Sequence, residues 1–181
     1  MQSERPGDIS LEGEPLAVLG PLLRPGNRAV EVILNDRGFD GAQALLESRA
    51  GKVRLINVVS SLGTSVCDAQ TRCFNQEAAA LGDDVVIVTV SVDLPFAQAE
   101  WCAAKGVDRV VMLSDHRDMA FGDAYGTHIK ELRVEQRSVF VVDRAGILRY
   151  VEYVPEISQH PNYEAALSAV RNLLEGSTDN A

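Results

Sequence analysis

The stretch KVRLINVVSSLGTSVCDAQTRCFNQEAAAL, residues 52–81, decides the fold of this chain. Its first part, residues 52–59, is a strand-like run of mostly apolar side chains, which is typical of a buried strand. Its last part, residues 68–81, is rich in Ala, Gln and Glu, which favour a helix. Cys67 is therefore expected in the first turn of a helix that follows a buried strand.

The expected position of Cys67 favours a reactive thiol. The first turn of a helix presents unpaired backbone N–H groups and the positive end of the helix dipole, and both favour a thiolate over a thiol. Thr64 lies three residues upstream, where its hydroxyl can bond the sulfur, bond an oxygen atom brought to it, or cap the helix. A cysteine at a strand–helix junction is also often a small buried apolar residue, so position alone leaves both roles open.

The composition bounds the size of the protein and the class of its partners. At 181 residues the chain is long enough for one well-buried core and too short for two comfortable domains. Its net charge is −9, from 17 Lys and Arg against 26 Asp and Glu. Because binding to nucleic acid or to an anionic membrane surface needs a positive face, we expect neither as a partner.

The N-terminal sequence and the cysteine content indicate a reducing compartment. Residues 1–15, MQSERPGDISLEGEP, contain no apolar core like that of a secretory signal, and we expect a soluble, cytoplasmic protein. The three cysteines are then buried and inert, metal-bound or redox-active. Because no Cys-x-x-Cys pair occurs and the three histidines are scattered without ligand spacing, we expect no metal.

The remainder of the chain alternates predicted strands and helices. Residues 1–14 are predicted as a flexible lead, 15–175 as a single domain and 176–181 as a polar tail. Apolar runs on both sides of residues 24–27 predict an N-terminal β-hairpin. Further strands are expected over 84–93, 110–113, 138–143 and 147–154, and helices over 41–49, 94–105, 117–125 and 162–174. This order predicts an α/β, thioredoxin-like fold with a central mixed sheet flanked by helices.

Four motifs along the chain together resemble a known family. They are Thr64-x-x-Cys67; DLPFAQ at residues 93–98 with Cys102 close behind; Arg137 at the entrance of the strand SVFVVD; and PNYEAAL at residues 161–167. In this order and spacing they are similar to the thiol peroxidases, the bacterial atypical two-cysteine branch of the peroxiredoxins. The resemblance covers about residues 13–174.

The resemblance implies a role for each matching residue. Cys67 would be the peroxidatic cysteine, which attacks hydrogen peroxide or an alkyl hydroperoxide and becomes a sulfenic acid. Thr64 and Arg137 would bind the reacting oxygens and stabilise the thiolate and the departing oxygen. Cys102 would be the resolving cysteine, which condenses with Cys67 to an intramolecular disulfide. A thioredoxin-like protein would reduce that disulfide by thiol exchange; no cofactor is implied, and the family implies a homodimer.

One departure from the family motif bears on activity. Seven residues before Cys67 the family has a proline, and this chain has Ser60. Serine restores an N–H donor, frees the backbone and admits water near the thiolate, so we expect reduced but surviving peroxidase activity. Gly63 and Ser65 also replace the aspartate and glycine usual in this branch, and the segment between residues 125 and 137 is shorter than usual.

Plainer interpretations stand beside these roles. Cys102 can be a core-facing helix residue, and Arg137 an ordinary surface arginine. Cys73 can be a packing residue or a second resolving thiol. Phe96 can belong to the core, to a dimer contact or to an apolar mouth that accepts alkyl hydroperoxides. The whole chain can be a redox sensor or disulfide relay, which Ser60 favours through slow turnover, or a scaffold that has lost the chemistry.

Overall fold

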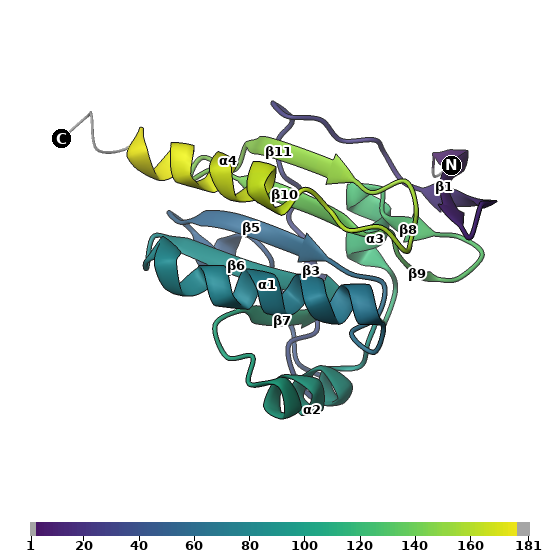
Figure 1. The fold of residues 1–181 in the computed structure, drawn as a ribbon, viewed down its shortest axis with the longest axis horizontal. Helices are drawn as coiled ribbons and strands as arrows, with labels where there is room; N and C mark the ends of the chain where they lie inside the picture. Colours follow the sequence, from purple (N-terminus) through teal and green to yellow (C-terminus); the bar gives the residue numbers. More distant parts are fainter. Residues whose placement is uncertain (1–2, 177–181) are drawn as a thin grey trace.

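A five-stranded mixed sheet forms the centre of the molecule in the computed structural model, which describes residues 3–176 (Figure 1). In strand order the sheet contains β11 (Leu148–Tyr153), β10 (Ser138–Val142), β5 (Val53–Val58), β6 (Val85–Ser91) and β7 (Val111–Ser114). β5, β6 and β7 run parallel, whereas β10 is antiparallel to both β5 and β11. The stretch that decides the fold therefore supplies the central strand of the sheet.

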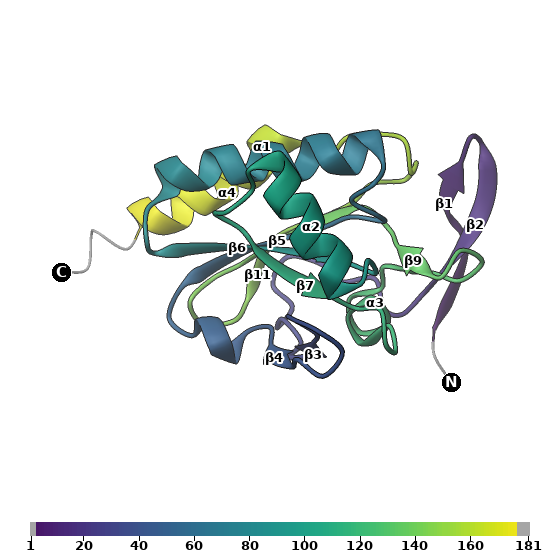
Figure 2. The same ribbon diagram turned by 90° about the horizontal axis from the view of Figure 1, so that it is seen from below.

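Each face of the sheet is covered by a different layer. α1 (Ser65–Leu81) and α4 (Tyr163–Glu175) lie together on one face, and α3 (Ala120–Tyr125) lies on the other (Figure 2). α2 (Pro95–Lys105) packs beside β7, at the edge of the sheet. Alternate residues of β5 serve the two layers, because Leu55 packs in the cluster under α1 and α4 while Ile56 packs in the cluster on the opposite face. The predicted thioredoxin-like α/β architecture is confirmed.

The ends of the helices follow capping signals in the sequence. Pro95 occupies the first turn of α2, where its missing N–H leaves no hydrogen bond unmade. Gly106 ends α2 in the left-handed conformation, with a φ of 65°. At the start of α4 the Asn162 side chain accepts a hydrogen bond from the backbone N–H of Ala165 at 3.0 Å. These strong local signals explain why the elements after residue 52 lie close to their predicted bounds.

The N-terminal hairpin forms earlier in the chain than the sequence predicted. β1 (Glu4–Leu11) pairs antiparallel with β2 (Glu14–Leu19), and Gly13 in the turn between them has a φ of 86°. Much of the stretch expected to be a flexible lead is therefore a strand. The predicted N-terminal β-hairpin is confirmed, but its turn lies at residues 12–13 rather than around 24–27, because no strand occupies residues 20–32.

Long-range packing explains the position of this hairpin. Ile9 is the only buried residue of β1, and it packs with Val18 of β2 and with Ile129. β2 pairs further with β8 (His128–Ile129), which pairs with β9 (Val134–Glu135). Residues more than a hundred positions later in the chain thus hold the N-terminal strands, and no local pattern carries that information.

The region between this hairpin and the central sheet also differs from its prediction. β3 (Ile33–Leu34) pairs antiparallel with β4 (Gln43–Ala44). The helix predicted over residues 41–49 is reduced to η1 (Glu47–Arg49), a single turn of 3₁₀ helix. The Glu31 carboxylate accepts hydrogen bonds from the backbone N–H groups of Leu46 and Glu47 at the start of this turn.

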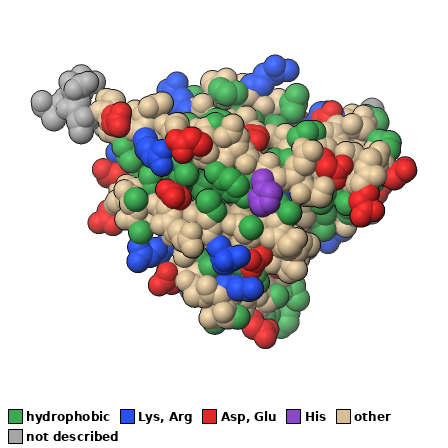
Figure 3. Space-filling view, viewed as in Figure 1, with side chains coloured by type: hydrophobic (Ala, Val, Ile, Leu, Met, Phe, Trp, Pro, Cys, Tyr) green, Lys and Arg blue, Asp and Glu red, His purple; other side chains and the backbone are tan. Residues whose placement is uncertain are grey.

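The chain ends beyond α4, and the predicted polar tail at residues 176–181 lies outside the described residues except for Gly176. Among residues 3–176 no helix is both long enough and apolar enough to cross a membrane. Acidic and basic side chains are interspersed over the face that carries α1 and α4 (Figure 3). This face shows no continuous basic area of the kind that nucleic acids require.

Candidate active site

Cys67 lies in the first turn of α1, directly after the loop that leaves β5. Thr64 is the N-cap of α1, so the predicted position of Cys67 is confirmed. The Cys67 side chain is fully buried, and it packs with Val59, Leu62 and the partly buried Trp101 of α2. Apolar side chains from two separate elements therefore enclose the sulfur.

Arg137 supplies the polar contact to this sulfur. Its Nη2 donates to Cys67 Sγ at 3.4 Å and to the carbonyl oxygen of Ile157 at 3.0 Å. The residue is only 1% exposed, so its interpretation as an ordinary surface arginine is wrong. β10 explains the placement: Ser138 pairs with Val58, which brings Arg137 to the end of β5 from which the cysteine loop departs. A fixed cation in this position can stabilise negative charge that develops beside it during a reaction.

A chain of buried amides and hydroxyls holds Arg137 from the side of the sheet. Arg137 Nη1 donates to Gln70 Oε1 at 2.6 Å, and Gln70 Nε2 donates to Asn57 Oδ1 at 2.5 Å. Asn57 Nδ2 donates to the hydroxyls of Thr89 at 3.0 Å and Thr71 at 3.3 Å. Sequence reasoning missed this network. Its signal was the presence of Asn57 and Thr89 in two otherwise apolar strands, because buried polar side chains need partners.

Thr64 lies at the start of α1, but its hydroxyl does not contact the sulfur. Its Oγ1 donates to the carbonyl oxygen of Ser61 at 3.0 Å, and it makes no side-chain cap bond to α1. The loop before it is fastened by Asp93, whose carboxylate accepts from Ser61 Oγ and from the backbone N–H of Leu62, both at 2.8 Å. Thr64 is exposed at the start of α1.

Ser60, which stands where the family has proline, is buried rather than open to water. It is 7% exposed, and its hydroxyl donates to the carbonyl oxygen of Glu135 at 2.7 Å. The added hydroxyl therefore has a partner inside the protein. Glu135 is itself fully buried, and burial together with the nearby Asp115 raises the pKa of its carboxyl well above the ordinary range. The Thr127 hydroxyl donates to this carboxyl group.

Cys102 lies in the second half of α2 and differs from Cys67 in its surroundings. It is half-buried, and burial raises the pKa of its thiol. Its carbonyl oxygen accepts hydrogen bonds from the N–H groups of Gly106 and Val107, which close the end of the helix. All three cysteines are free thiols, and within residues 3–176 the Cys102 sulfur makes no hydrogen bond or disulfide.

Two contacts join α2 to the first turns of α1. Trp101, next to Cys102, packs in the apolar cluster around Cys67. Lys105 Nζ, in the last turn of α2, lies 3.3 Å from Asp68 Oδ1, and Asp68 directly follows Cys67. Neighbours of the two predicted catalytic cysteines are thus in contact, and both cysteines are free thiols.

The other candidate positions give less chemistry. Cys73 is half-buried, and burial followed by the nearby Glu77 raises the pKa of its thiol. Phe96 is 51% exposed and packs edge-on against the exposed ring of Phe39, so its assignment to the core is wrong. No cluster of three or more His, Cys, Asp or Glu side chains able to hold a metal ion occurs within residues 3–176.

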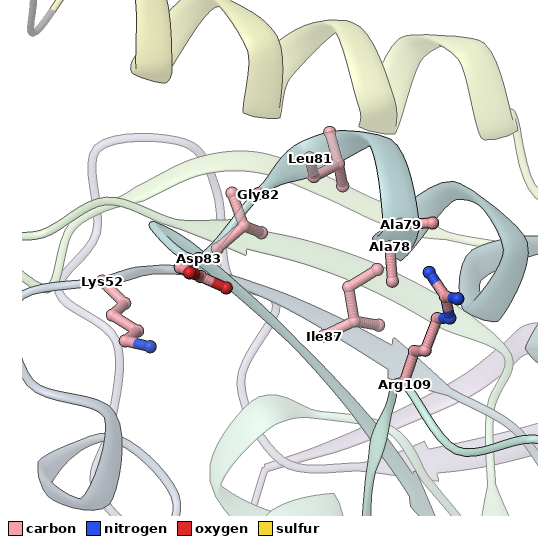
Figure 4. Close-up of a pocket in the computed structure, with 9 residues that line it drawn as sticks. Lys52, Ala78, Ala79, Leu81, Gly82, Asp83, Ile87 and Arg109 are labelled. Atoms are coloured by element: carbon pink, nitrogen blue, oxygen red, sulfur yellow. The ribbon is translucent and has the colours of Figure 1, made fainter.

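A cavity of about 310 Å³ lies at the far end of α1 from Cys67. Figure 4 shows Lys52 and Arg109 on its two sides, with Asp83 between the strands and the last turn of the helix. No cysteine lines it. The carbonyl ends of α1 make this end of the helix negative, so the cavity lacks the features that surround Cys67.

Comparison with models of known protein families identifies the family of the chain. The model of a family described as Redoxin matches residues 24–167. The chain belongs to the Redoxin family. This assignment agrees with the buried cysteine at the start of α1 and with the thioredoxin-like sheet.

Individual relatives of this Redoxin chain are more specific. It is 48% identical over 168 residues to a thiol peroxidase of Bacillus subtilis, which covers 93% of this chain and 99% of that protein. It is 49% identical over 163 residues to a thiol peroxidase of Listeria monocytogenes, covering 90% of this chain and 97% of that protein. The resemblance to thiol peroxidases predicted from the four motifs is confirmed.

Solved structures agree on the fold of this Redoxin chain. A peroxiredoxin-like protein from Aquifex aeolicus superposes with a TM-score of 0.83 at 33% identity, covering 95% of this chain and 98% of that one. A thiol peroxidase from Chromobacterium violaceum gives a TM-score of 0.78 at 20% identity, covering 96% and 98%; at this identity the likeness shows the fold alone.

Proposed function

We propose that this chain is a thiol-dependent peroxidase that reduces hydrogen peroxide and alkyl hydroperoxides through Cys67. The observation that carries the proposal is the contact of 3.4 Å between Arg137 Nη2 and a fully buried Cys67 Sγ at the start of a helix. The similarity to thiol peroxidases along nearly the whole chain supports the same activity.

In the first step the Cys67 thiolate attacks the terminal oxygen of the peroxide. A sulfur–oxygen bond forms, the O–O bond breaks, and the leaving alkoxide or hydroxide takes a proton to become an alcohol or water. Negative charge moves from sulfur to the leaving oxygen, and Arg137 remains beside both. The backbone N–H groups of Val66 and Cys67 have no hydrogen-bond partner within the helix, so they are further donors for the leaving oxygen at the start of α1.

In the second step the Cys102 thiol condenses with the sulfenic acid of Cys67 and releases water. The resulting disulfide requires the Cα atoms to lie about 4.4–6.8 Å apart. The hydrogen bonds that close α2 at Cys102 and the contacts of Trp101 oppose this approach. Local unwinding of the first turn of α1 and the last turn of α2 therefore belongs to the cycle.

In the third step a thioredoxin-type dithiol protein reduces the disulfide and is itself oxidised. This partner, a cytoplasmic location and a homodimer follow from the resemblance to thiol peroxidases, and we include them in the proposal on that basis. The cycle needs no metal, flavin or haem, because the sulfur atoms carry the two electrons.

The first experiment is to treat the reduced protein with one equivalent of hydrogen peroxide and map its cysteines by peptide mass spectrometry. Trp101, which adjoins Cys102, gives a fluorescence signal to follow the reaction in time. We expect a Cys67–Cys102 disulfide, formed equally well in a Cys73→Ser control. A persistent sulfenic acid on Cys67 with free Cys102 would remove the resolving role, and an unreactive Cys67 would overturn the whole proposal.

A further inference from the structure

Arg54 is a buried cation that the peroxidase chemistry does not use. It is 3% exposed, and no carboxylate lies within ion-pair distance of it in the described part of the chain. Its Nη1 donates to the carbonyl oxygen of Lys52 at 2.5 Å, and its Nε has no acceptor. Burying a charge without a partner is strongly unfavourable, so this guanidinium calls for an explanation.

Two other buried arginines have partners that account for the burial of their charge. Arg49 donates to the carbonyl oxygens of Ala44 and Leu45 and to the Gln43 side chain, so it ties η1 to β4. Arg137 lacks a carboxylate too, but it faces the Cys67 sulfur. Arg54 has neither a set of structural acceptors nor an anion.

The two carboxylates near Arg54, those of Glu31 and Asp143, already accept hydrogen bonds from other donors. The Glu31 carboxylate accepts from the backbone N–H groups of Val32, Leu46 and Glu47. The Asp143 carboxylate accepts from Arg149 Nε at 2.6 Å and from the N–H groups of Ala145 and Ile147. Burial lowers the pKa of the Arg54 guanidinium, and Asp143 offsets this only in part.

Arg54 forms part of the wall of a cavity of about 440 Å³. Arg28 and Arg144 also line it, the latter in an ion pair with Asp84, and Leu46 and Ala145 give it an apolar portion. Glu31 and Glu47 line it too, and the Glu31 carboxylate is held by backbone N–H groups. The cavity lies far from Cys67: Arg54 is the second residue of β5, whereas the cysteine loop leaves its other end, and Arg54 shares the sheet face of Ile56, opposite α1. The cavity of Figure 4 differs, because its cations Lys52 and Arg109 are not buried.

We propose that the cavity between Arg28, Arg54 and Arg144 binds a small phosphate or carboxylate anion, in a site separate from the peroxidase centre. A guanidinium matches the oxygen atoms of either group with parallel N–H donors. The apolar portion of the wall suits an anion with a short hydrocarbon body. The bound anion supplies the negative charge that Arg54 lacks in the protein itself.

The test is a titration of the reduced, full-length protein with inorganic phosphate, phenyl phosphate and succinate in separate arms, at constant ionic strength. The readouts are the Nε–Hε resonances of the arginines in ¹⁵N spectra and the melting temperature. We expect a saturable shift of the Arg54 resonance, a rise of several degrees in melting temperature at saturation, and tighter binding of phenyl phosphate than of phosphate. Comparison of the phosphate and succinate arms identifies the preferred head group.

Two variants make the result decisive. Arg54→Met keeps the volume of the side chain and removes the charge, and we expect loss of binding with a fold that is intact or more stable. Arg171→Met removes an exposed arginine on α4 and should leave binding unchanged. No saturable binding by any probe, or equal binding by Arg54→Met and the unmodified protein, would overturn the proposal. The rate of Cys67 oxidation is expected to be the same in both variants, so this result is independent of the peroxidase proposal.

Discussion

Cys67 and Cys102 lie on neighbouring helices, but their surroundings differ in burial and in nearby charge. Cys67 stands at the positive end of α1, fully buried, with Arg137 as a donor 3.4 Å away. Cys102 stands in the second half of α2, half-buried, and burial raises the pKa of its thiol. Under the proposed function, this difference selects the attacking sulfur: Cys67 lies beside a cation, whereas burial disfavours the thiolate of Cys102.

Removing each sulfur in turn tests the difference between Cys67 and Cys102. Cys67→Ser is expected to abolish the reaction with hydrogen peroxide. Cys102→Ser is expected to react at the unmodified second-order rate but only once, leaving a sulfenic acid on Cys67. Stopped-flow fluorescence and trapping with dimedone measure both steps. A Cys102→Ser protein that turns over normally with a thioredoxin system would contradict the assignment of Cys102.

The cation beside Cys67 gives the next largest effect. Arg137→Met removes the donor to the sulfur and the leaving oxygen, and the rate with peroxide is expected to fall about 10²–10³-fold. Arg137→Lys keeps the charge but cannot bind Gln70, Ile157 and the sulfur together, so an intermediate rate is expected. Arg149→Met, an exposed arginine on β11, is the control and should react normally. Equal rates for all three variants would show that Arg137 is only structural.

Most of the fold that follows residue 52 was predictable because its signals are local, and only the short strands β8 and β9 were missed there. The β-branched run of β6, the proline that opens α2 and the glycine that closes it each fix an element through nearby residues. Within the first 50 residues a hairpin was predicted but misplaced, because distant contacts decide its position. β2 needs β8, and an isolated bridge joins Arg28 to Ile147.

In the candidate site, too, the residues with local sequence signals were predicted and those that depend on long-range contacts were not. Cys67 and Arg137 carry recognisable motifs, so the sequence pointed to them. The Gln70–Asn57 chain, the partner of Ser60 and the unpaired Arg54 depend on which elements meet in space, and the sequence shows them only as polar residues in apolar surroundings. The hydroxyl of Thr64 was expected near the sulfur, and instead it bonds to Ser61.

The ion pair between Asp68 and Lys105 tests how the two cysteines are kept apart. It joins the first turns of α1 to the last turn of α2, so it must break before a disulfide forms. Lys105→Met is expected to speed disulfide formation after the sulfenic acid by up to about fivefold, as for an exposed pair of about 1 kcal/mol. Arg72→Met is the matched control, because Arg72 binds Asp68 from within α1 at 2.8 Å. Unchanged or slower disulfide formation in Lys105→Met would contradict this role of the ion pair.

The same ion pair predicts a pH dependence. Burial acts to raise the pKa of Asp68, but its hydrogen bonds with Arg72 and Lys105 outweigh this and lower it below the ordinary carboxyl range. Because the pKa of Asp68 is lowered in the folded protein, the ion pair stabilises the contact between α1 and α2 at pH values above the ordinary carboxyl pKa. This stabilisation is lost as the pH falls through the folded-state pKa of Asp68. The advantage of Lys105→Met in disulfide formation should therefore be constant near neutral pH and shrink in acid. Rates measured by acid-quench alkylation from neutral pH down to below the ordinary Asp pKa of about 3.9 check this.

The smallest expected effect is that of a substitution at Ser60, in the loop before Cys67. Ser60→Pro restricts the loop before Cys67, and we expect it to raise the second-order rate with peroxide about twofold, as for a stabilisation of about 0.4 kcal/mol. The substitution also removes the hydrogen bond to Glu135. Ser60→Ala removes that bond without adding a ring, so it separates the two contributions and should be no faster than the unmodified protein. If Ser60→Pro folds normally and its rate is unchanged or lower, the loop does not limit Cys67, and its reactivity rests on Arg137 and the start of α1 alone.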